Sequence, residues 1–311
     1  MDALASLLDG PRARNAFLLR SVFNPPWAIR IEDRAPLTIV VVVAGRAHCW
    51  YDDETPTELG PGDVAIFRGP DPYTFADDPA TAPQMIIGPD QECRTIDGAV
   101  VKPMDLFGVR SWGNSEQGAT VMITGTYTMQ GDVSTRLLAT LPRVLTVRAH
   151  EWDAPIVALL TTEMGRDVPG QDPVLDRLLD VLLISVLRTW FARPDAEAPG
   201  WYRAAADPVV GQVLKLIHNN PEQQWTVESL AMQAGVSRAA LARRFTELVG
   251  ESPMAYLTDW RLSLAADLLR NPDATIGAVA RKVGYGSPFA LSSAFKRVRG
   301  MSPAEHRKLV S

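Results

Sequence analysis

The sequence predicts an α+β protein of two domains, a β-barrel domain followed by an all-α domain. Its 311 residues are 46% hydrophobic and 22% charged, a composition typical of a folded chain with room for two domains. Short β-branched and aromatic runs occupy the first part of the chain, whereas helical periodicity begins near residue 154 and continues to the C-terminus. Residues 193–207, rich in Pro, Gly and Ala, read as a linker. We therefore expect domains at residues 1–192 and 208–311, with the linker at 193–207.

Five short runs predict the strands of the N-terminal domain. Turn sequences such as Gly60-Pro61-Gly62-Asp63 separate these runs at the spacing of an antiparallel sandwich or barrel. The predicted strands are residues 37–43, 46–51, 64–67, 84–87 and 119–127.

A helix is predicted to follow these strands, over residues 173–191. Pro173 suits its first turn, and Pro194 marks a point at which it must already have ended. Its apolar arc is wider than contact with one neighbour requires. Two explanations remain open: burial against the helix's own barrel, or additional packing on the same helix of a second copy in a homodimer. The residues expected at that dimer contact are Leu175, Leu179, Leu182, Val186 and Trp190.

The C-terminal domain contains a repeated unit. Leu, Phe, Gly, Ser and Pro recur at an offset of 50 residues when 241–253 is aligned with 291–303. Each copy reads as two helices joined by a turn: Thr226 and Thr275 cap the first helices, and Gly235 and Gly284 supply the left-handed turn residue. Ser237 and Ser287 then cap the second helices. This is the helix-turn-helix arrangement, in which the second helix can enter the major groove of DNA.

Helical geometry indicates which side chains face the DNA. If Leu241, Phe245 and Leu248 point inward, residues two positions before and after Leu241 lie about 200° away and face outward. The same construction applies to Leu291, Phe295 and Val298. The base-reading residues expected from it are Ala239, Ala242, Arg243, Thr246, Phe289, Ser292, Ser293 and Lys296.

Residue chemistry suggests how these side chains act. The fork of Arg243 matches the two acceptors of guanine, and Phe289 can meet thymine methyl groups. A helix over about 252–269 would hold the two reading heads about 34 Å apart on one side of the duplex. Phosphate contacts that position the protein without specifying sequence are expected from Ser237, Arg238, Arg244, Ser287, Arg297, Arg299 and Arg307.

The charge distribution agrees with a DNA-binding C-terminal domain. From residue 208 onward the chain has 13 Lys and Arg against 8 Asp and Glu (+5), which leaves 18 against 28 (−10) for residues 1–207. A basic module joined to an acidic remainder is the asymmetry expected of such a fusion.

Residues 208–310 resemble the DNA-binding domain of AraC/XylS-family transcription regulators. The resemblance rests on the pattern Ile276-x-x-Val279-Ala280-x-x-x-Gly284-Tyr285-x-Ser287, followed by Phe295-Lys296-Arg297-x-x-Gly300-x-Ser302-Pro303. It implies base reading by Arg243, which lies two residues before the first Phe. Ser293 stands where the family often has a second arginine, and His306 replaces a frequent aromatic residue.

The N-terminal domain is similar to the cupin-type sensor found in one branch of these regulators. Gly45-Arg46-Ala47, residues 58–63 and residues 141–145 carry this similarity. It implies a homodimeric regulator, not an enzyme, that binds promoter DNA, responds to a small-molecule effector and recruits or obstructs RNA polymerase. No apolar stretch of 18 residues and no signal peptide are recognisable, so we expect a cytoplasmic protein that does not associate with membranes.

Two other functions of the N-terminal domain are alternatives to effector sensing. A metal-dependent cupin enzyme, with the C-terminal helices as an interaction module, needs two or three histidines, and this region offers only His48 and His150, so no cofactor is expected. Redox sensing would use Cys49 and Cys93, with Arg94 lowering the pKa of Cys93. The favoured alternative is effector binding inside the barrel, lined by His48, Trp50, Arg68 and Tyr73.

Overall fold

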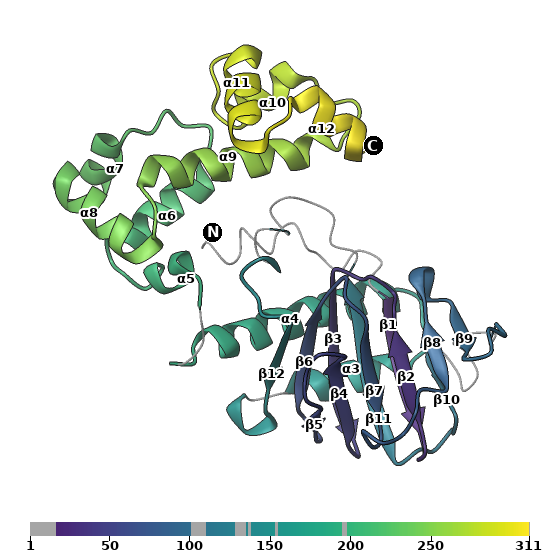
Figure 1. Cartoon of the computed structure of the whole chain (residues 1–311). Coiled ribbons are helices and arrows are strands. Elements are labelled where there is room, and N and C mark those ends of the chain that lie inside the picture. The colour runs from purple at the N-terminus through teal and green to yellow at the C-terminus, as the bar shows by residue number, and fades with distance from the viewer. Residues whose placement is uncertain are drawn as a thin grey trace. The chain divides into compact units, whose positions relative to one another are not determined.

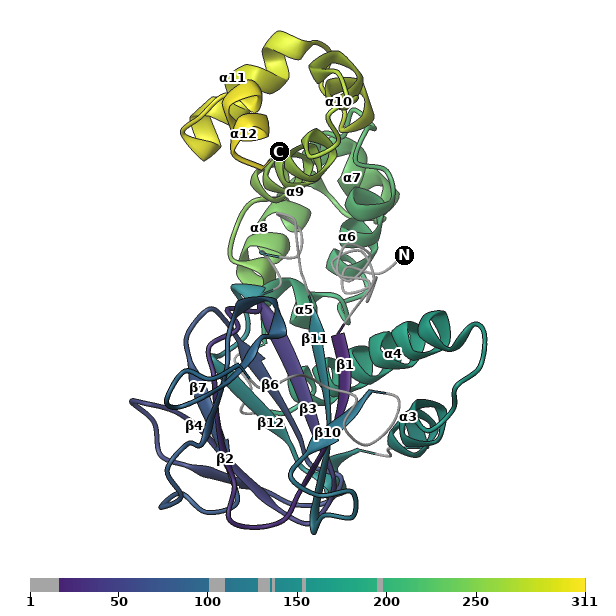
Figure 2. The same ribbon diagram turned by 90° about the vertical axis from the view of Figure 1, so that its right-hand side faces the viewer.

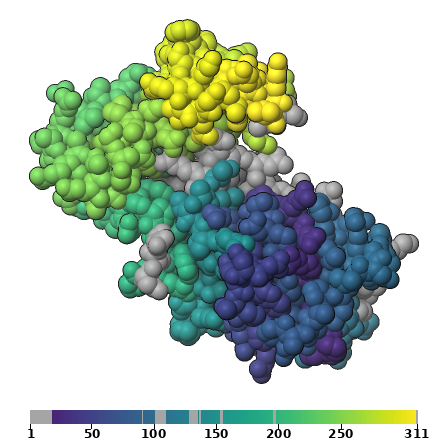
Figure 3. All heavy atoms as spheres, in the orientation of Figure 1, coloured from purple at the N-terminus to yellow at the C-terminus, as the bar shows by residue number. Residues whose placement is uncertain are grey.

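The computed structural model describes residues 17–100, 110–127, 135, 138–152, 155–194 and 198–310. The chain divides into two compact units, whose main parts are residues 11–129 with 141–196, and residues 197–311. The first is coloured purple to teal and the second green to yellow (Figure 1, Figure 3). None of the described helices is both long enough and apolar enough to cross a membrane.

The N-terminal unit is built from two six-stranded sheets. The order of the first is β10 (Ser111–Gly113), β1 (Phe17–Phe23), β11 (Thr120–Tyr127), β3 (Leu37–Ala44), β6 (Val64–Arg68) and β12 (Val144–Val147). The order of the second is β5 (Thr57–Leu59), β4 (Ala47–Tyr51), β7 (Tyr73–Ala76), β2 (Ala28–Ile31), β8 (Met85–Ile87) and β9 (Cys93–Thr95). Neighbouring strands are antiparallel except β1 with β10 and β2 with β8. The described strands confirm the expected β-rich N-terminal domain of an α+β chain, and they form two open sheets that are not closed into a barrel.

Aromatic and aliphatic side chains fill the space between the two sheets. Val40 and Phe67 from the first sheet and Tyr51, Tyr73 and Phe75 from the second belong to one buried cluster. The rings of Phe67 and Tyr73 stack with their centroids 4.2 Å apart. Alternate residues of β3 point into this cluster and away from it, and all of Leu37–Val42 are nonetheless buried. Strand β3 is therefore covered on both faces.

Helices α3 (Pro155–Met164) and α4 (Gln171–Phe191) cover the outer face of the first sheet (Figure 2). Gly125 permits the close approach of α4, because a Cβ atom there would lie 2.5 Å from the Leu179 side chain. The hydroxyl of Tyr127 donates a hydrogen bond to the carbonyl of Leu179 at 2.9 Å. Two short 3-10 turns, Pro89–Gln91 and Ala149–Glu151, complete the unit.

This packing corrects the dimer contact expected from the sequence. Leu175, Leu179, Leu182 and Val186 are at most 2% exposed within one chain, since they pack on their own sheet. Trp190 is half-buried beneath the guanidinium of Arg193, 4.5 Å from its ring centroid. The apolar arc is wide because it faces both the sheet and α3.

The segment expected to be a linker contains a helix. Helix α5 (Gly200–Ala204) lies within residues 193–207 and buries Trp201 and Ala204. Gly200 lies so close to the end of α8 that a Cβ atom would be 2.7 Å from the carbonyl oxygen of Val249. Arg193, at the other end of the segment, forms a 2.5 Å ion pair with Glu151 of the N-terminal unit. The Pro- and Ala-rich composition of the segment predicted a linker, and the helix with its buried Trp201 was therefore missed.

The C-terminal unit consists of α5 and seven further described helices. They are α6 (Val210–Asn219), α7 (Val227–Gln233), α8 (Arg238–Val249), α9 (Pro253–Leu269), α10 (Ile276–Lys282), α11 (Pro288–Arg299) and α12 (Pro303–Val310). Helices α7 and α8 form one helix-turn-helix and α10 and α11 the other. Helix α9 joins them, and Tyr256, Leu257 and Trp260 are buried along it.

The duplicated turns have the geometry that the sequence predicts. Gly235 and Gly284 have φ angles of 69° and 86°, which favour glycine. The hydroxyls of Ser237 and Ser287 accept hydrogen bonds from the amides of Ala240 and Ala290. Such caps each stabilise a helix by about 1 kcal/mol. Local sequence therefore determines where both second helices begin.

Candidate nucleic-acid interface

Helix α8 presents an exposed face opposite two fully buried side chains. Leu241 and Phe245 are 0% exposed, because they pack against α7 and the unit's core. The side chains of Ala239, Arg243 and Thr246 are exposed, and Ala242 is half-buried. Leu248, expected to point inward, is instead 36% exposed. The buried stripe of α8 has ended by this position, near the helix C-terminus.

Helix α11 repeats this arrangement with different chemistry. Leu291 and Phe295 are 0% exposed, whereas Phe289, at the second position of the helix, is 80% exposed. Ser293 and Lys296 are exposed and Ser292 is half-buried. Val298, the counterpart of Leu248, was expected to point inward and is 46% exposed. The same departure at both positions shows that it belongs to the repeated unit.

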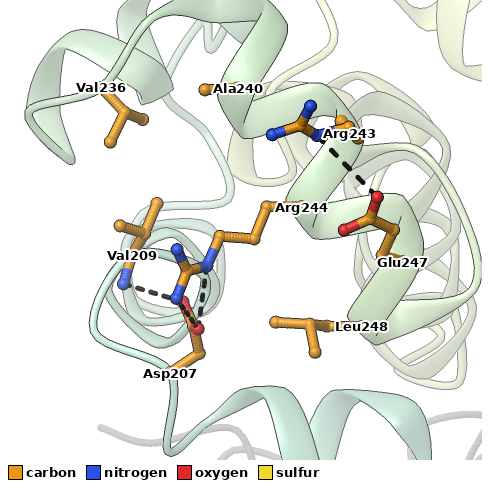
Figure 4. Close-up of a pocket in the computed structure, with 8 residues that line it drawn as sticks. All are labelled: Asp207, Val209, Val236, Ala240, Arg243, Arg244, Glu247 and Leu248. Atoms are coloured by element: carbon orange, nitrogen blue, oxygen red, sulfur yellow. Dashed lines mark hydrogen bonds and ion pairs between the residues drawn. The ribbon is translucent and has the colours of Figure 1, made fainter.

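Two arginines at the centre of α8 differ in their surroundings (Figure 4). Arg243 projects from the helix with 77% of its side chain exposed, and its Nε lies 3.8 Å from a carboxylate oxygen of Glu247. Arg244 donates hydrogen bonds from Nε and Nη2 to one oxygen of Asp207, at 2.9 and 2.5 Å. Arg243 is therefore available to a ligand, whereas Arg244 already has an acidic partner.

Asp207 also connects this ion pair to the start of α6. Its second carboxylate oxygen accepts hydrogen bonds from the amides of Val209 and Val210. Burial alone would raise the pKa of Asp207, but Arg244 and these two amides outweigh that effect and lower it. The same pair raises the pKa of Arg244. A pocket of about 320 Å³, lined by Asp207, Arg243, Arg244 and five neighbours, lies beside the pair (Figure 4).

The other expected phosphate-contacting residues fall into two groups. Arg299 donates to the Ser263 hydroxyl at 3.0 Å, and Arg307 donates to the carbonyl of Ala274. Both arginines therefore support the fold around the second helix-turn-helix. Arg238 and Arg297 are exposed at the two second helices. Ser237 and Ser287 use their hydroxyls as helix caps and lie at the N-termini where backbone amides can bind phosphate.

One basic cluster was not identified from the sequence. Arg281 and Lys282 end α10, and both are exposed. The first helix of a helix-turn-helix crosses the DNA backbone, so this is a suitable place for phosphate contacts. Two adjacent cations in the last turn of that helix were the available signal.

The residues expected to line an effector pocket do not share one face. Along β4, Cys49 and Tyr51 point into the packed core, and His48 and Trp50 lie half-buried on the opposite face. His48 is 3.1 Å from the carbonyl oxygen of Asp77 and 3.6 Å from the Glu58 carboxylate. The expectation that His48 and Trp50 line the interior is therefore wrong, because the side chains of β4 that face the core are those of Cys49 and Tyr51.

The other two expected pocket residues also lie apart from each other. Tyr73 is buried in the core and Arg68 is half-buried at the end of β6.

The two cysteines are also placed differently from a redox-sensing pair. Cys49 and Cys93 are 2% and 3% exposed. Burial raises the pKa of Cys49 to about 12 and also raises the pKa of Cys93. Arg94 pairs with Glu92 at 2.6 Å, and the expected lowering of the Cys93 pKa is wrong. Both thiols are thus protonated at neutral pH.

Within the described part of the chain, no three His, Cys, Asp or Glu side chains are close enough together to bind a metal ion. His150 lies in the short turn Ala149–Glu151, outside the space between the sheets. Several acidic groups of this unit instead form local ion pairs with arginines, such as Asp63 with Arg148 at 2.9 Å.

Two capped second helices with exposed outer faces, held on one connecting helix, define a DNA-binding protein of the double helix-turn-helix class. Sequence comparison identifies the family. The cupin family matches residues 2–192 and the helix-turn-helix domain family matches residues 230–309. The chain belongs to the AraC-like transcription regulators, as the resemblance predicted.

Individual relatives match along almost the whole chain. A putative AraC-like transcription regulator of Streptomyces lividans is 34% identical over 99% of this chain and 98% of its own length. The regulator AlkR of Acinetobacter baylyi is 30% identical over 99% of each chain. Among solved structures, the DNA-binding domain of AdpA in complex with a target DNA is 36% identical, covers 33% of this chain and 93% of that one, and has a TM-score of 0.31.

Proposed function

We propose that this AraC-like regulator binds a composite promoter site, with α8 reading one half-site and α11 the other. The observation that carries the proposal is the duplicated burial pattern: Leu241 with Phe245, and Leu291 with Phe295, are fully buried and leave an outward face on each helix. Base contacts come from Ala239, Ala242, Arg243 and Thr246 on α8 and from Phe289, Ser292, Ser293 and Lys296 on α11. Arg243 recognises guanine and Phe289 packs on thymine methyl groups.

Phosphate contacts surround these reading faces. The N-termini of α8 and α11, begun by Ser237 and Ser287, supply backbone amides, and Arg238 and Arg297 supply charge. Arg281 and Lys282 extend the contact across the backbone. Arg244, Arg299 and Arg307 are not assigned phosphate contacts, because each donates hydrogen bonds within the chain.

The N-terminal unit is the regulatory part of the proposal. It responds to a small-molecule effector and forms a homodimer in the cytoplasm, and the DNA-bound protein recruits or obstructs RNA polymerase. Because aromatic side chains fill the space between the sheets, an effector has to displace some of them or bind outside that space. We propose no catalytic activity.

The dimer contact is reassigned to the outer stripe of α4. Val174 and Val181 are 43% and 48% exposed, and Leu178 lies between them, half-buried. Ser185 and Arg188 continue the stripe at alternating intervals of four and three residues, the spacing at which two helices pack side by side. The same stripe of a second copy is its partner.

Genome-wide mapping of bound DNA, followed by fluorescence anisotropy on the recovered sites, tests DNA recognition. We expect the full-length protein to bind a recovered site at least about 1,000-fold more tightly than a shuffled duplex at the same salt concentration. Equal binding of both duplexes would refute the proposal.

A further inference from the structure

Arg261, near the middle of α9, makes its hydrogen bonds with the connection from α6 to α7, just before the first helix-turn-helix. Its side chain is nearly buried, with 9% of the residue exposed. Nε donates to the carbonyl of Pro221 and Nη2 donates to the carbonyl of Gln223, both at 2.6 Å. Both carbonyls belong to the connection from α6 to α7, which leads directly into the first helix-turn-helix.

The same guanidinium touches the turn of the second helix-turn-helix unit. A Cβ atom at Gly284 would lie 2.6 Å from Arg261 Nη2 and 2.7 Å from the Pro221 carbonyl oxygen. Arg261 also lies over the ring of Tyr285, with 5.9 Å between Cζ and the ring centroid. Gln224 adds a parallel link, because its Nε2 donates to the Gly284 carbonyl at 2.8 Å. Gly284, in the turn of the second helix-turn-helix, is thus in contact with the connection that precedes the first helix-turn-helix.

The chemistry of this contact favours a positional role over simple packing. A buried cation is costly to desolvate, and an apolar side chain would fill the same space without that cost. Carbonyl oxygens pair with a guanidinium only in particular directions, and a planar fork with several donors fixes those directions. Arg261 therefore supplies orientation between parts of the chain that are about 60 residues apart.

We propose that Arg261 is a positioning residue that sets the separation and mutual rotation of α8 and α11. The protein then accepts only DNA sites whose half-sites have one spacing. This inference rests on the proposed two-headed DNA binding. Each base pair inserted between half-sites shifts the second one by about 3.4 Å and turns it by about 35°, so a rigid reader distinguishes spacings sharply.

The test measures affinity by fluorescence anisotropy across a series of duplexes with one or two base pairs inserted or deleted between the half-sites. We expect the full-length wild-type protein to lose at least tenfold in affinity on a single insertion. Arg261→Met should lose about tenfold at the best spacing, change less than threefold on insertion, and bind an isolated half-site as the wild type does. An Arg261→Met spacing profile identical to that of the wild type would overturn the proposal.

Two further measurements keep the inference testable if Arg261→Met is poorly folded. Gln224→Leu removes the parallel link at an exposed position, and we expect it to weaken spacing discrimination partially. Nitroxide labels at Glu228→Cys and Lys282→Cys, both exposed, should give a narrow distance distribution that Gln224→Leu broadens; an unchanged spacing profile and distribution would refute the link. The native thiols are buried and remain unlabelled.

The control separates this inference from the proposed function. Arg243→Ala should weaken binding at every spacing and leave the shape of the profile unchanged. If the wild-type protein binds two half-sites no more tightly than one, the two-headed model itself is wrong, whatever Arg261 does.

Discussion

Arg243 and Glu247 lie one turn apart on α8, with 3.8 Å between Nε and the nearer carboxylate oxygen, and both side chains are more than 60% exposed. An exposed pair of this kind contributes little to stability, because solvent screens the interaction. The guanidinium lies beside Glu247 on the outward face of the helix and stays exposed. Arg243 can exchange this partner for a base edge at small cost.

Arg243→Ala should therefore reduce sequence discrimination at one position of the site. We expect a loss of about 1–3 kcal/mol against the duplex with guanine at that position and a much smaller loss when the guanine is replaced. Fluorescence anisotropy on a set of single-base variants of the site measures this difference.

Arg238→Ala is the matched control for that measurement. It removes a phosphate contact, so affinity should fall equally for all base variants and the salt slope should fall by about one. An Arg243→Ala variant that behaved in this same uniform way would contradict base reading by Arg243.

The Asp207–Arg244 pair makes a second prediction, on pH dependence. The folded-state pKa of Asp207 lies below its ordinary value of 3.8, so its stabilising effect is present above that value and is lost as the pH falls through the folded pKa. Asp207→Asn should unfold at lower urea concentration than the wild type at pH 7, and the gap between the two midpoints should narrow as the pH falls below 3.8 and close below the folded-state pKa.

Asp273→Asn, which changes an exposed carboxylate of the same unit, serves as the control and should follow the wild type at every pH. A gap between Asp207→Asn and the wild type that does not narrow as the pH falls below 3.8 would mean that the stabilisation does not depend on the charge of Asp207.

The sequence predicted the C-terminal unit well because its signals are local. Helix caps, left-handed glycines and a fifty-residue repeat each depend on neighbours in the chain, and the structure has them where predicted. The Asp207–Arg244 pair joins residues 37 apart in the chain, so no local sequence signal predicts it. Leu248 and Val298 were misassigned because hydrophobicity alone does not show where a buried stripe ends.

The N-terminal unit was predicted less completely for a related reason. The five predicted strands are present within about two residues, whereas the other described strands, β1, β2, β5, β7, β9, β10 and β12, were missed. The alternation along β4 separates His48 and Trp50 from Cys49 and Tyr51, but the sequence does not say which pair faces inward. The wrong choice moved the predicted effector pocket to the other face of the sheet.

Burial of the two thiols predicts resistance to oxidation. Because the pKa of Cys49 is about 12 and that of Cys93 is also raised, neither thiol forms an appreciable thiolate at pH 7. An aromatic disulfide reagent should react with fewer than about one in ten thiols of the folded protein and with both after unfolding.

DNA binding should be equally insensitive to mild peroxide in the wild type and in a Cys49→Ser, Cys93→Ser variant that retains the wild-type fold. A peroxide-dependent change in affinity that the double variant abolishes would establish redox sensing in place of effector binding.

The last prediction distinguishes the two apolar sides of α4. Leu179 faces the sheet at Gly125, so Leu179→Ala should destabilise the fold by about 2–5 kcal/mol. Val181 faces away and is 48% exposed, so Val181→Glu should leave the thermal midpoint of the monomer nearly unchanged and place a charge in the proposed dimer contact. Sedimentation of the full-length protein should then show dissociation at concentrations at which the wild type is dimeric.

Val168→Glu is the control, since Val168 is equally exposed at 49% but lies before α4 and off its outer stripe. It should sediment as the wild type does. Dissociation by both glutamate variants would indicate a general charge effect. A dimeric Val181→Glu protein would show that the second copy does not dock along Val174, Leu178 and Val181, and the apolar stripe would then need a different occupant.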